Sequence, residues 1–291
     1  MGKLFCLILS ALMIFSSVAA SKAAELQPVV SVNLFGGAER GSGASAGGIG
    51  GGEILGLLPL ADRIGLQGSI LNQGGNGGHR LGVSLGPVYA YSSGKVGLFG
   101  DYVHENRGDN NFFYLRGIWS HYFTNFDLAL SYTQPVNSLQ HTRVTVIDRD
   151  LDGGQCNNGV PFRRRSVNRS APAINELKGI VRYYPTAKTE INAGLLVNSF
   201  AGPGHNDPGT GFGGVFGFAF QALDWLIIRP IQGQMDTRER YRITSGVELV
   251  WAPAQQVYGR SRAQEKDTSF AVASTAGGTF ASCSRNGTGD G

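Results

Sequence analysis

The sequence predicts an all-β fold, a transmembrane antiparallel up-and-down β-barrel of about twelve strands. Three observations predict it. Runs in which apolar and polar residues alternate recur along the chain, and this is the period of a strand with two different faces. The connections between these runs alternate between short turns and longer loops, as they do in barrels that cross a membrane. Aromatic residues collect near the ends of the runs, where rings meet the membrane–water interface.

Twelve segments have the pattern and the length of a tilted strand that crosses a bilayer, about 9 to 12 residues. They are Val29–Gly36, Gly48–Leu58, Ile64–Leu71, Arg80–Tyr91, Lys95–Glu105, Asn111–Phe123, Asp127–Gln134, Glu176–Tyr184, Thr189–Phe200, Phe212–Gln221, Trp225–Met235 and Glu239–Trp251. Two of them fit less well, because Gly48–Leu58 is rich in glycine and Trp225–Met235 contains Pro230, which cannot donate to a neighbouring strand. Either segment could carry a β-bulge.

The connections follow an order that indicates two sides of a membrane. Short turns are expected at Pro59–Arg63, Ser92–Lys95, Thr124–Asp127, Pro185–Lys188 and Ala222–Asp224. Loops are expected at Gly37–Gly47, Asn72–His79, Asn106–Asn110, Pro135–Asn175 and Ala201–Gly211, with a shorter link at Asp236–Arg238. Outer-membrane barrels have short periplasmic turns and long outer loops, and an even number of strands returns both termini to the periplasm.

The segment Phe212–Gln221 favours lipid over a second protein layer. Phe212, Phe216, Phe218 and Phe220 fall on one face of this strand, opposite small residues. In a soluble protein another layer would have to cover those rings, whereas in a membrane barrel lipid covers them. The alternative is a soluble all-β sandwich whose aromatic residues form the core.

Composition and the N-terminus place the protein outside the cytoplasm. Glycine makes up 44 of 291 residues, about twice the usual ~7%, which suits close strand contacts and tight turns rather than helices. Lys3, the apolar run Leu4–Phe15 and the small residues that follow have the order of a secretory signal peptide, so we expect residues 1–23 to be removed after export. No later run is apolar enough for a transmembrane helix.

The remaining charge argues against a nucleic-acid partner. Removing Lys3 and Lys22 with the signal peptide leaves a surplus of only two basic residues, and no basic stripe with interleaved aromatic residues accompanies it. The pattern of strands stops after Trp251, so residues 26–252 are the expected barrel and residues 253–291 the expected flexible periplasmic tail. Cys156 then falls in an outer loop and Cys283 in the tail, so we expect no disulfide between them.

The segment Tyr241–Trp251 is expected to close the barrel by pairing with Val29–Gly36. Its string Thr244-x-Gly246-x-x-Leu249-x-Trp251 resembles the closing-strand signal of bacterial outer-membrane β-barrels, and the whole chain resembles the porin-like barrels in general. The resemblance implies a bacterial outer-membrane location, contact with membrane lipid and lipopolysaccharide, and recognition of Thr244–Trp251 by the barrel-assembly machinery. The signal usually ends the chain, whereas here about forty residues follow it.

Charged residues recur on the face of the strands that we assign to the lumen. The predicted lumen-lining residues are Asp101, Arg116, Lys178, Arg182, Glu190, Arg229, Arg242 and Glu248. They could line a narrow water-filled path with a mild preference for anions. They could also form an ion-pair network that plugs the barrel.

The long connection Pro135–Asn175 holds two candidate binding features. Asp148, Asp150 and Asp152, followed by Gly153, match the start of a calcium-binding loop, but the twelfth position is Gly159 instead of the bidentate glutamate. Further along, Arg163, Arg164, Arg165 and Arg169 form a basic cluster that could bind lipopolysaccharide phosphates or an acidic partner. The alternative for both features is a solvated loop.

Catalysis finds little support in this sequence. No familiar lipase string occurs, and the proximity of Ser138 and His141 does not distinguish a catalytic dyad from a polar loop. Arg107-Gly108-Asp109 matches an adhesion tripeptide but is also a good turn sequence. We therefore expect a non-enzymatic, porin-like passive channel for small hydrophilic solutes, without a cofactor other than possible calcium in the Asp148–Gly153 loop. The alternative is a closed barrel that displays loops for adhesion or surface structure.

Overall fold

The computed structural model describes Leu26 and residues 28–40, 46–75, 78–106, 110–136, 139–148, 163–201, 210–237 and 241–251. The expected signal peptide (residues 1–23) and the expected tail (residues 253–291) lie outside the described residues. So do the tripeptide Arg107–Asp109, Cys156 and Cys283. Within the described ranges, no helix is long and apolar enough to cross a membrane.

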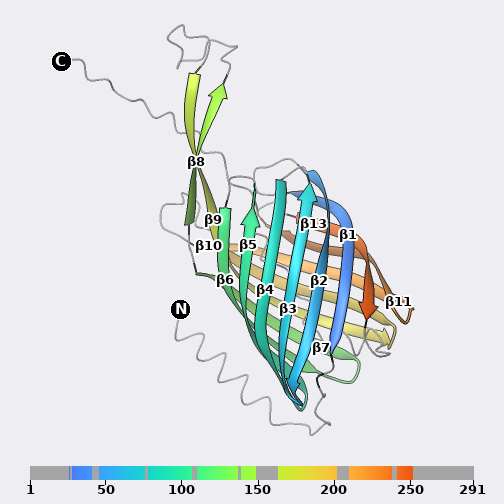
Figure 1. Cartoon of the computed structure of the whole chain (residues 1–291). Coiled ribbons are helices and arrows are strands. Elements are labelled where there is room, and N and C mark those ends of the chain that lie inside the picture. The colour runs from blue at the N-terminus through green and yellow to red at the C-terminus, as the bar shows by residue number, and fades with distance from the viewer. Residues whose placement is uncertain are drawn as a thin grey trace, which may run out of the picture.

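The described residues form thirteen strands, and twelve of them close into a barrel (Figure 1). Their bounds are β1 Val29–Arg40, β2 Gly47–Ala61, β3 Ile64–Gly75, β4 Gly78–Tyr91, β5 Gly94–Glu105, β6 Asn110–Tyr122, β7 Phe126–Pro135, β8 Leu139–Asp148, β9 Arg163–Thr186, β10 Thr189–Ala201, β11 Thr210–Leu223, β12 Leu226–Asp236 and β13 Tyr241–Trp251. Each barrel strand pairs antiparallel with its neighbours, and among the described strands β8 and the part of β9 that pairs with it stand outside the barrel. The predicted twelve-stranded antiparallel barrel is confirmed.

Strand β13 closes the barrel against β1. The pairing runs from Val30 opposite Trp251 to Arg40 opposite Tyr241, with Gly246 opposite Phe35. The predicted pairing of these two segments is therefore confirmed. It extends four residues past the predicted end of the first strand at Gly36, because β1 keeps its ladder with both neighbours through Glu39.

The connections at one end of the barrel are short, as predicted. Two residues separate β2 from β3, β4 from β5, β9 from β10 and β11 from β12, and three separate β6 from β7. The opposite end differs from the prediction between β3 and β4, where residues 76–77 alone lie between the strands instead of the loop Asn72–His79. Gly78 begins β4 with a φ of 115°, a backbone conformation that favours glycine.

The connection Pro135–Asn175 was predicted to be a loop, and this is wrong for two parts of it. Strand β8 pairs with the first part of β9, from Leu139 opposite Pro172 to Asp148 opposite Arg163. This ribbon stands beyond the barrel wall (Figure 1). The β-branched run Val144–Ile147 favours a strand locally, even though the run cannot join the closed sheet.

Pro230 lies at a β-bulge in β12. Towards β13, the register moves from Arg229 opposite Gly246 to Gln232 opposite Thr244, so β12 contains one extra residue. The pairing with β11 shifts between Phe218 and Phe220. The other weak segment, Gly48–Leu58, pairs without a shift on both sides and forms a regular part of β2.

The two faces of the strands differ in the way that a membrane barrel requires. Leu81, Val83 and Leu85 on β4 are 37%, 38% and 55% exposed, whereas the alternate residues Arg80 and Ser84 are buried. The apolar face thus points outward and the polar face inward, the reverse of a soluble protein. Exposed rings collect at the short-turn end of the barrel, namely Tyr89, Phe123, Phe126, Tyr183, Trp225 and Trp251.

One side of the barrel interior is filled by hydrophobic side chains. Leu71, Val103, Phe112 and Tyr114 pack together, with Phe35 against them. A second cluster contains Val88, Phe99 and Ile118. Because these residues come mostly from β3 to β6, the space that remains open lies towards the strands on the other side.

Candidate functional site

The candidate site is a polar cavity inside the barrel. It has a volume of about 200 Å³ and is bounded by β1 to β3 and β9 to β13. Its polar and charged lining residues are Ser31, Asn33, Glu53, Lys178, Arg182, Glu190, Asn192, Arg229, Gln232, Gln234, Arg242, Thr244 and Glu248. Such a lining can exchange hydrogen bonds with water or a polar solute.

The eight residues predicted to line the lumen all come from the inner face of the wall, but they divide into two groups. Lys178, Arg182, Glu190, Arg229, Arg242 and Glu248 line the cavity. Asp101 and Arg116 are buried in the filled half of the interior, beside Phe99. The strand period thus places these residues on one face, while the packing of the large side chains decides which of them reach the open space.

Arg229 and Glu248 form an ion pair in the cavity wall. They lie on the adjacent strands β12 and β13, and both are buried. Arg229 Nη2 and Nε donate to Glu248 Oε2 over 2.7 and 3.1 Å. Because each charge has an opposite partner within hydrogen-bonding distance, the pair can remain ionised beside the cavity.

Arg116 and Asp101 form a second buried pair in the filled half. Arg116 Nε lies 2.7 Å from Asp101 Oδ2, and its Nη2 donates to Asp101 Oδ1 over 3.1 Å and to the Ser84 hydroxyl over 3.0 Å. The Ser84 hydroxyl donates to Asp101 Oδ1 over 2.6 Å. The guanidinium also stacks over the Phe99 ring at 4.6 Å. These contacts join three adjacent strands, β4, β5 and β6, through one charged cluster.

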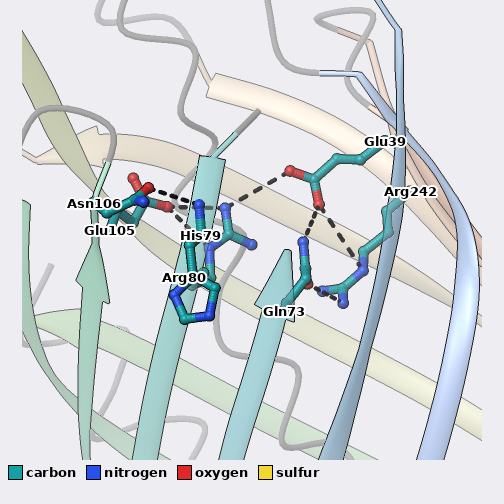
Figure 2. Close-up of polar contacts among 7 residues, drawn as sticks. All are labelled: Glu39, Gln73, His79, Arg80, Glu105, Asn106 and Arg242. Atoms are coloured by element: carbon teal, nitrogen blue, oxygen red, sulfur yellow. Dashed lines mark hydrogen bonds and ion pairs between the residues drawn. The ribbon is translucent and has the colours of Figure 1, made fainter. Parts of the chain in front are cut away.

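A third cluster bridges the loop end of the barrel, and we call it the outer-mouth network (Figure 2). It consists of Glu39, Gln73, Arg80, Glu105 and Arg242. Arg80 Nη2 lies 2.9 Å from Glu105 Oε1 and 3.7 Å from Glu39 Oε1. Gln73 donates to Glu39 Oε2 over 3.3 Å and accepts from Arg242 Nη2 over 2.5 Å.

The outer-mouth network links strands that are not neighbours in the sheet. Arg242 on β13 reaches Gln73 on β3, with β1 and β2 between them. On β2, Gly51 pairs with both Phe35 and Gln73. A Cβ at Gly51 would lie only 3.1 Å from the Phe35 ring and 2.9 Å from Gln73 Cα, so this glycine lets the wall pack closely under the network.

The sequence interpretation placed only Arg242 of this network in the lumen. Glu39 was missed because the first strand was predicted to end at Gly36. The alternation of strand faces could have identified Glu39. It lies an even number of residues after Ser31, Asn33 and Phe35, which face inward. Gln73 likewise lies an even number of residues after the inward-facing Gln67 and Ser69, beyond the predicted end of the third strand at Leu71.

Positive and negative charges are balanced among the buried residues that the structure describes. Six are basic, namely Arg80, Lys95, Arg116, Lys178, Arg182 and Arg229. Six are acidic, namely Asp101, Glu105, Asp127, Glu176, Glu190 and Glu248. Along the cavity itself the charges are nearly balanced, with four basic residues (Lys178, Arg182, Arg229 and Arg242) and three acidic ones (Glu53, Glu190 and Glu248). The lining therefore gives no reason to expect a strong preference for ions of one sign.

The loop features predicted from the sequence lie mainly outside the described residues. Asp150 and Asp152 are outside them, and Asp148 is described in its backbone alone, as the last residue of β8. Arg163, Arg164, Arg165 and Arg169 lie in the part of β9 that pairs with β8, and their side chains are likewise outside the described residues. Within the described part of the chain, no three His, Cys, Asp or Glu side chains gather in a way that could hold a metal ion.

No known family model and no curated protein matches this chain. Among solved structures it is similar to the NanC porin, with 11% identity and a TM-score of 0.51 over 75% of this chain and 98% of that one. The fold is that of the porin-like outer-membrane barrels. Two further similar structures are a KdgM porin in complex with disordered oligogalacturonate (11% identity, TM-score 0.46, 76% and 99% covered) and the translocator domain of the autotransporter NalP from Neisseria meningitidis (9% identity, TM-score 0.45, 86% and 95% covered).

Proposed function

We propose that this protein is an outer-membrane channel that passes small hydrophilic solutes passively. The observation that carries the proposal is the polar cavity enclosed by the barrel, whose wall holds Lys178, Arg182 and Glu190 next to the Arg229–Glu248 pair. The apolar outer face meets lipid. A polar cavity inside a wall of this kind suits the passage of water-soluble molecules.

The wall favours passage over tight binding. The polar lining offers many donors and acceptors to a hydrated solute, while the Arg229–Glu248 contact keeps two of its charges engaged with each other. Because the charges that line the cavity are nearly balanced in number, we propose that the channel discriminates little between small cations and small anions. The role requires no catalytic residue, and we propose that the protein is not an enzyme.

Proteoliposome swelling tests the proposed function. Vesicles that contain the purified protein are placed in isosmotic solutions of neutral solutes of increasing size, from glycerol to a trisaccharide. We expect rapid swelling with the smallest solutes and a steep loss of rate as size increases, because the cavity is narrow. Vesicles with the protein that swell no faster than protein-free vesicles, for every solute, would contradict the proposal.

A closed barrel that displays surface features is the second candidate function. The ribbon of β8 and the first part of β9 favours it, because a channel does not need a strand pair beyond its wall. We make two further proposals for the connection that contains this ribbon. Arg163, Arg164, Arg165 and Arg169 bind lipopolysaccharide phosphates, and Asp148, Asp150 and Asp152 bind calcium. Neither is needed for passage through the lumen.

Deleting residues 139–172 separates the two functions, since the barrel part of β9 begins beyond them. Solute passage that is the same with and without the ribbon supports the channel. Lost binding of cells to a surface or to lipopolysaccharide, from a barrel that passes no solute before or after the deletion, supports display. A folded, heat-modifiable barrel in both proteins is the control that the deletion leaves the wall intact.

A further inference from the structure

Two residues of the barrel wall line two separate spaces. Besides the central cavity, a small pocket of about 20 Å³ lies near the loop ends of β1, β9, β12 and β13. Its lining includes Arg40, Ile174 and Tyr241, all at the loop side of their strands or of the barrel wall. Arg242 and Gln234 line both this pocket and the central cavity. They therefore lie at the boundary between the cavity and the outer end of the barrel.

Arg242 is held at this boundary from one side. Its Nη2 donates to Gln73 over 2.5 Å, and its Nε lies 4.0 Å from Glu39 Oε2. The guanidinium also lies 5.3 Å from the centre of the Phe35 ring, which in turn packs on the filled half of the interior. A cation fixed by an amide, a carboxylate and a ring has little freedom to move out of the path.

Gln234 is held from the opposite side. It lies on β12 two residues after Gln232, where the bulge ends, and it pairs with Arg242 in the ladder between β12 and β13. Its Nε2 donates to Glu176 Oε2 over 3.2 Å, across the two strands β10 and β11 that separate β12 from β9. The neighbouring side chains Arg242 and Gln234 are thus anchored to opposite parts of the wall.

We propose that Arg242 and Gln234 form the narrowest point of the lumen, which we call the neck, and that Glu39 is the residue that positions Arg242 there. This inference rests on the proposed channel function and specifies where that channel selects by size. Glu39 suits the positioning role because its carboxylate faces Arg80, Gln73 and Arg242 together. A solute that enters from the outer end has to pass the neck before it reaches the central cavity.

Conductance of neck variants tests the inference. Arg242→Ala and Gln234→Ala remove the side chains that line the neck, and we expect single-channel conductance to rise about two-fold for Arg242→Ala and less for Gln234→Ala. The matched controls are Ser245→Ala on β13 and Ile231→Ala on β12, whose side chains are exposed on the outer face. Wild-type conductance in both neck variants would overturn the inference while leaving the channel function in place.

The positioning role of Glu39 has a separate readout. Glu39→Gln keeps the shape of the side chain but removes a negative charge beside two guanidinium groups. In a salt gradient the reversal potential should shift towards the value for anion passage, because Arg242 and Arg80 lose part of their compensation. An unchanged reversal potential in this variant would contradict the role. A merely structural contact would change stability without changing the selectivity.

Thiol labelling tests the neck without requiring conductance. Asn33 lines the central cavity, so Asn33→Cys reports access to it in a chain whose Cys156 and Cys283 are replaced with serine. Intact cells are treated with methanethiosulfonate ethyltrimethylammonium, and any access from the periplasmic end is common to both backgrounds. We expect several-fold faster labelling when Arg242→Ala is added. Equal labelling rates in the two backgrounds would overturn the proposal that Arg242 narrows the lumen. A wild-type protein that conducts no current, combined with faster labelling in the Arg242→Ala background, would refute only the channel function.

Discussion

Arg116 and Asp101 show how a charge is kept inside this barrel. Both side chains are 2% exposed, and the carboxylate accepts from the guanidinium and from Ser84. Removing one partner of a buried pair leaves the other charge without compensation, whereas replacing both with apolar side chains of similar volume removes that penalty. The pair is thus a source of stability only while both members are present.

We therefore predict that Asp101→Leu alone lowers the free energy of unfolding by about 3 kcal/mol. The double variant Asp101→Leu with Arg116→Met should recover most of the loss. Urea unfolding in detergent, followed by tryptophan fluorescence and by heat-modifiable gel migration, measures both variants. Wild-type stability of the single variant would show that the Arg116 charge does not depend on Asp101.

Sequence reasoning at this scale assigns a residue to a face but not to a partner. Period two placed Asp101, Arg116 and Arg242 on the inner face without indicating which contacts they make. Arg242 contacts Gln73, which is 169 residues away in the chain. That contact depends on the stagger of the closed barrel and on how far each side chain reaches across two intervening strands. The alternation of residues within one strand indicates neither.

Strand β13 closes the barrel by pairing with β1. Its glycine at position 246 faces Phe35 on β1, and an added Cβ there would lie 3.1 Å from Phe35 Cα and Cβ. Trp251 ends the strand as a residue that is 60% exposed on the outer face, at the short-turn end where aromatic rings collect. The close approach of β1 therefore favours glycine at position 246, and the membrane interface favours an aromatic residue at position 251.

We predict that Gly246→Val and Trp251→Asp each reduce the amount of folded barrel in the outer membrane. The valine would push β13 away from β1, and the aspartate would put a charge at the lipid interface. Truncation after Pro253 should leave assembly unchanged. Heat-modifiable migration of membrane fractions measures all three, and failed assembly of the truncated chain would show that further residues are needed for closure.

The ribbon of β8 and β9 shows where element prediction from sequence fails. The run Val144–Ile147 has strand propensity, but the alternation of short and long connections was already satisfied without another barrel strand. The sequence pattern could not indicate a strand pair that leaves the wall. The bulge at Pro230 was predictable, in contrast, because proline lacks the donor that a regular ladder requires.

For the whole molecule, the barrel was predictable because closure depends on features that repeat in every strand. Those features are the two faces, the short turns at one end and the aromatic ring positions. Whether the lumen is open was not predictable, because it depends on the large side chains that fill one half, such as Phe112 and Tyr114, and on the bridges at the outer mouth. The packing of these side chains and the bridges between distant strands are determined only by the folded structure.

The balance of buried charge leads to a prediction for the whole lumen. In a gradient of potassium chloride across a planar bilayer, the reversal potential of the wild-type channel should lie close to zero, because the described charges that line the cavity are nearly balanced, four basic against three acidic. A strong preference for chloride would contradict this balance and would indicate that residues beyond the described ones set the selectivity.

Single-channel recording of the purified protein in a planar bilayer tests the proposed channel function. We expect discrete, passive current steps from the wild-type barrel, and larger steps when Arg242→Ala widens the neck. The absence of steps at every voltage from both proteins, in preparations that retain heat-modifiable folding, would contradict the channel and leave a closed barrel that serves the membrane surface.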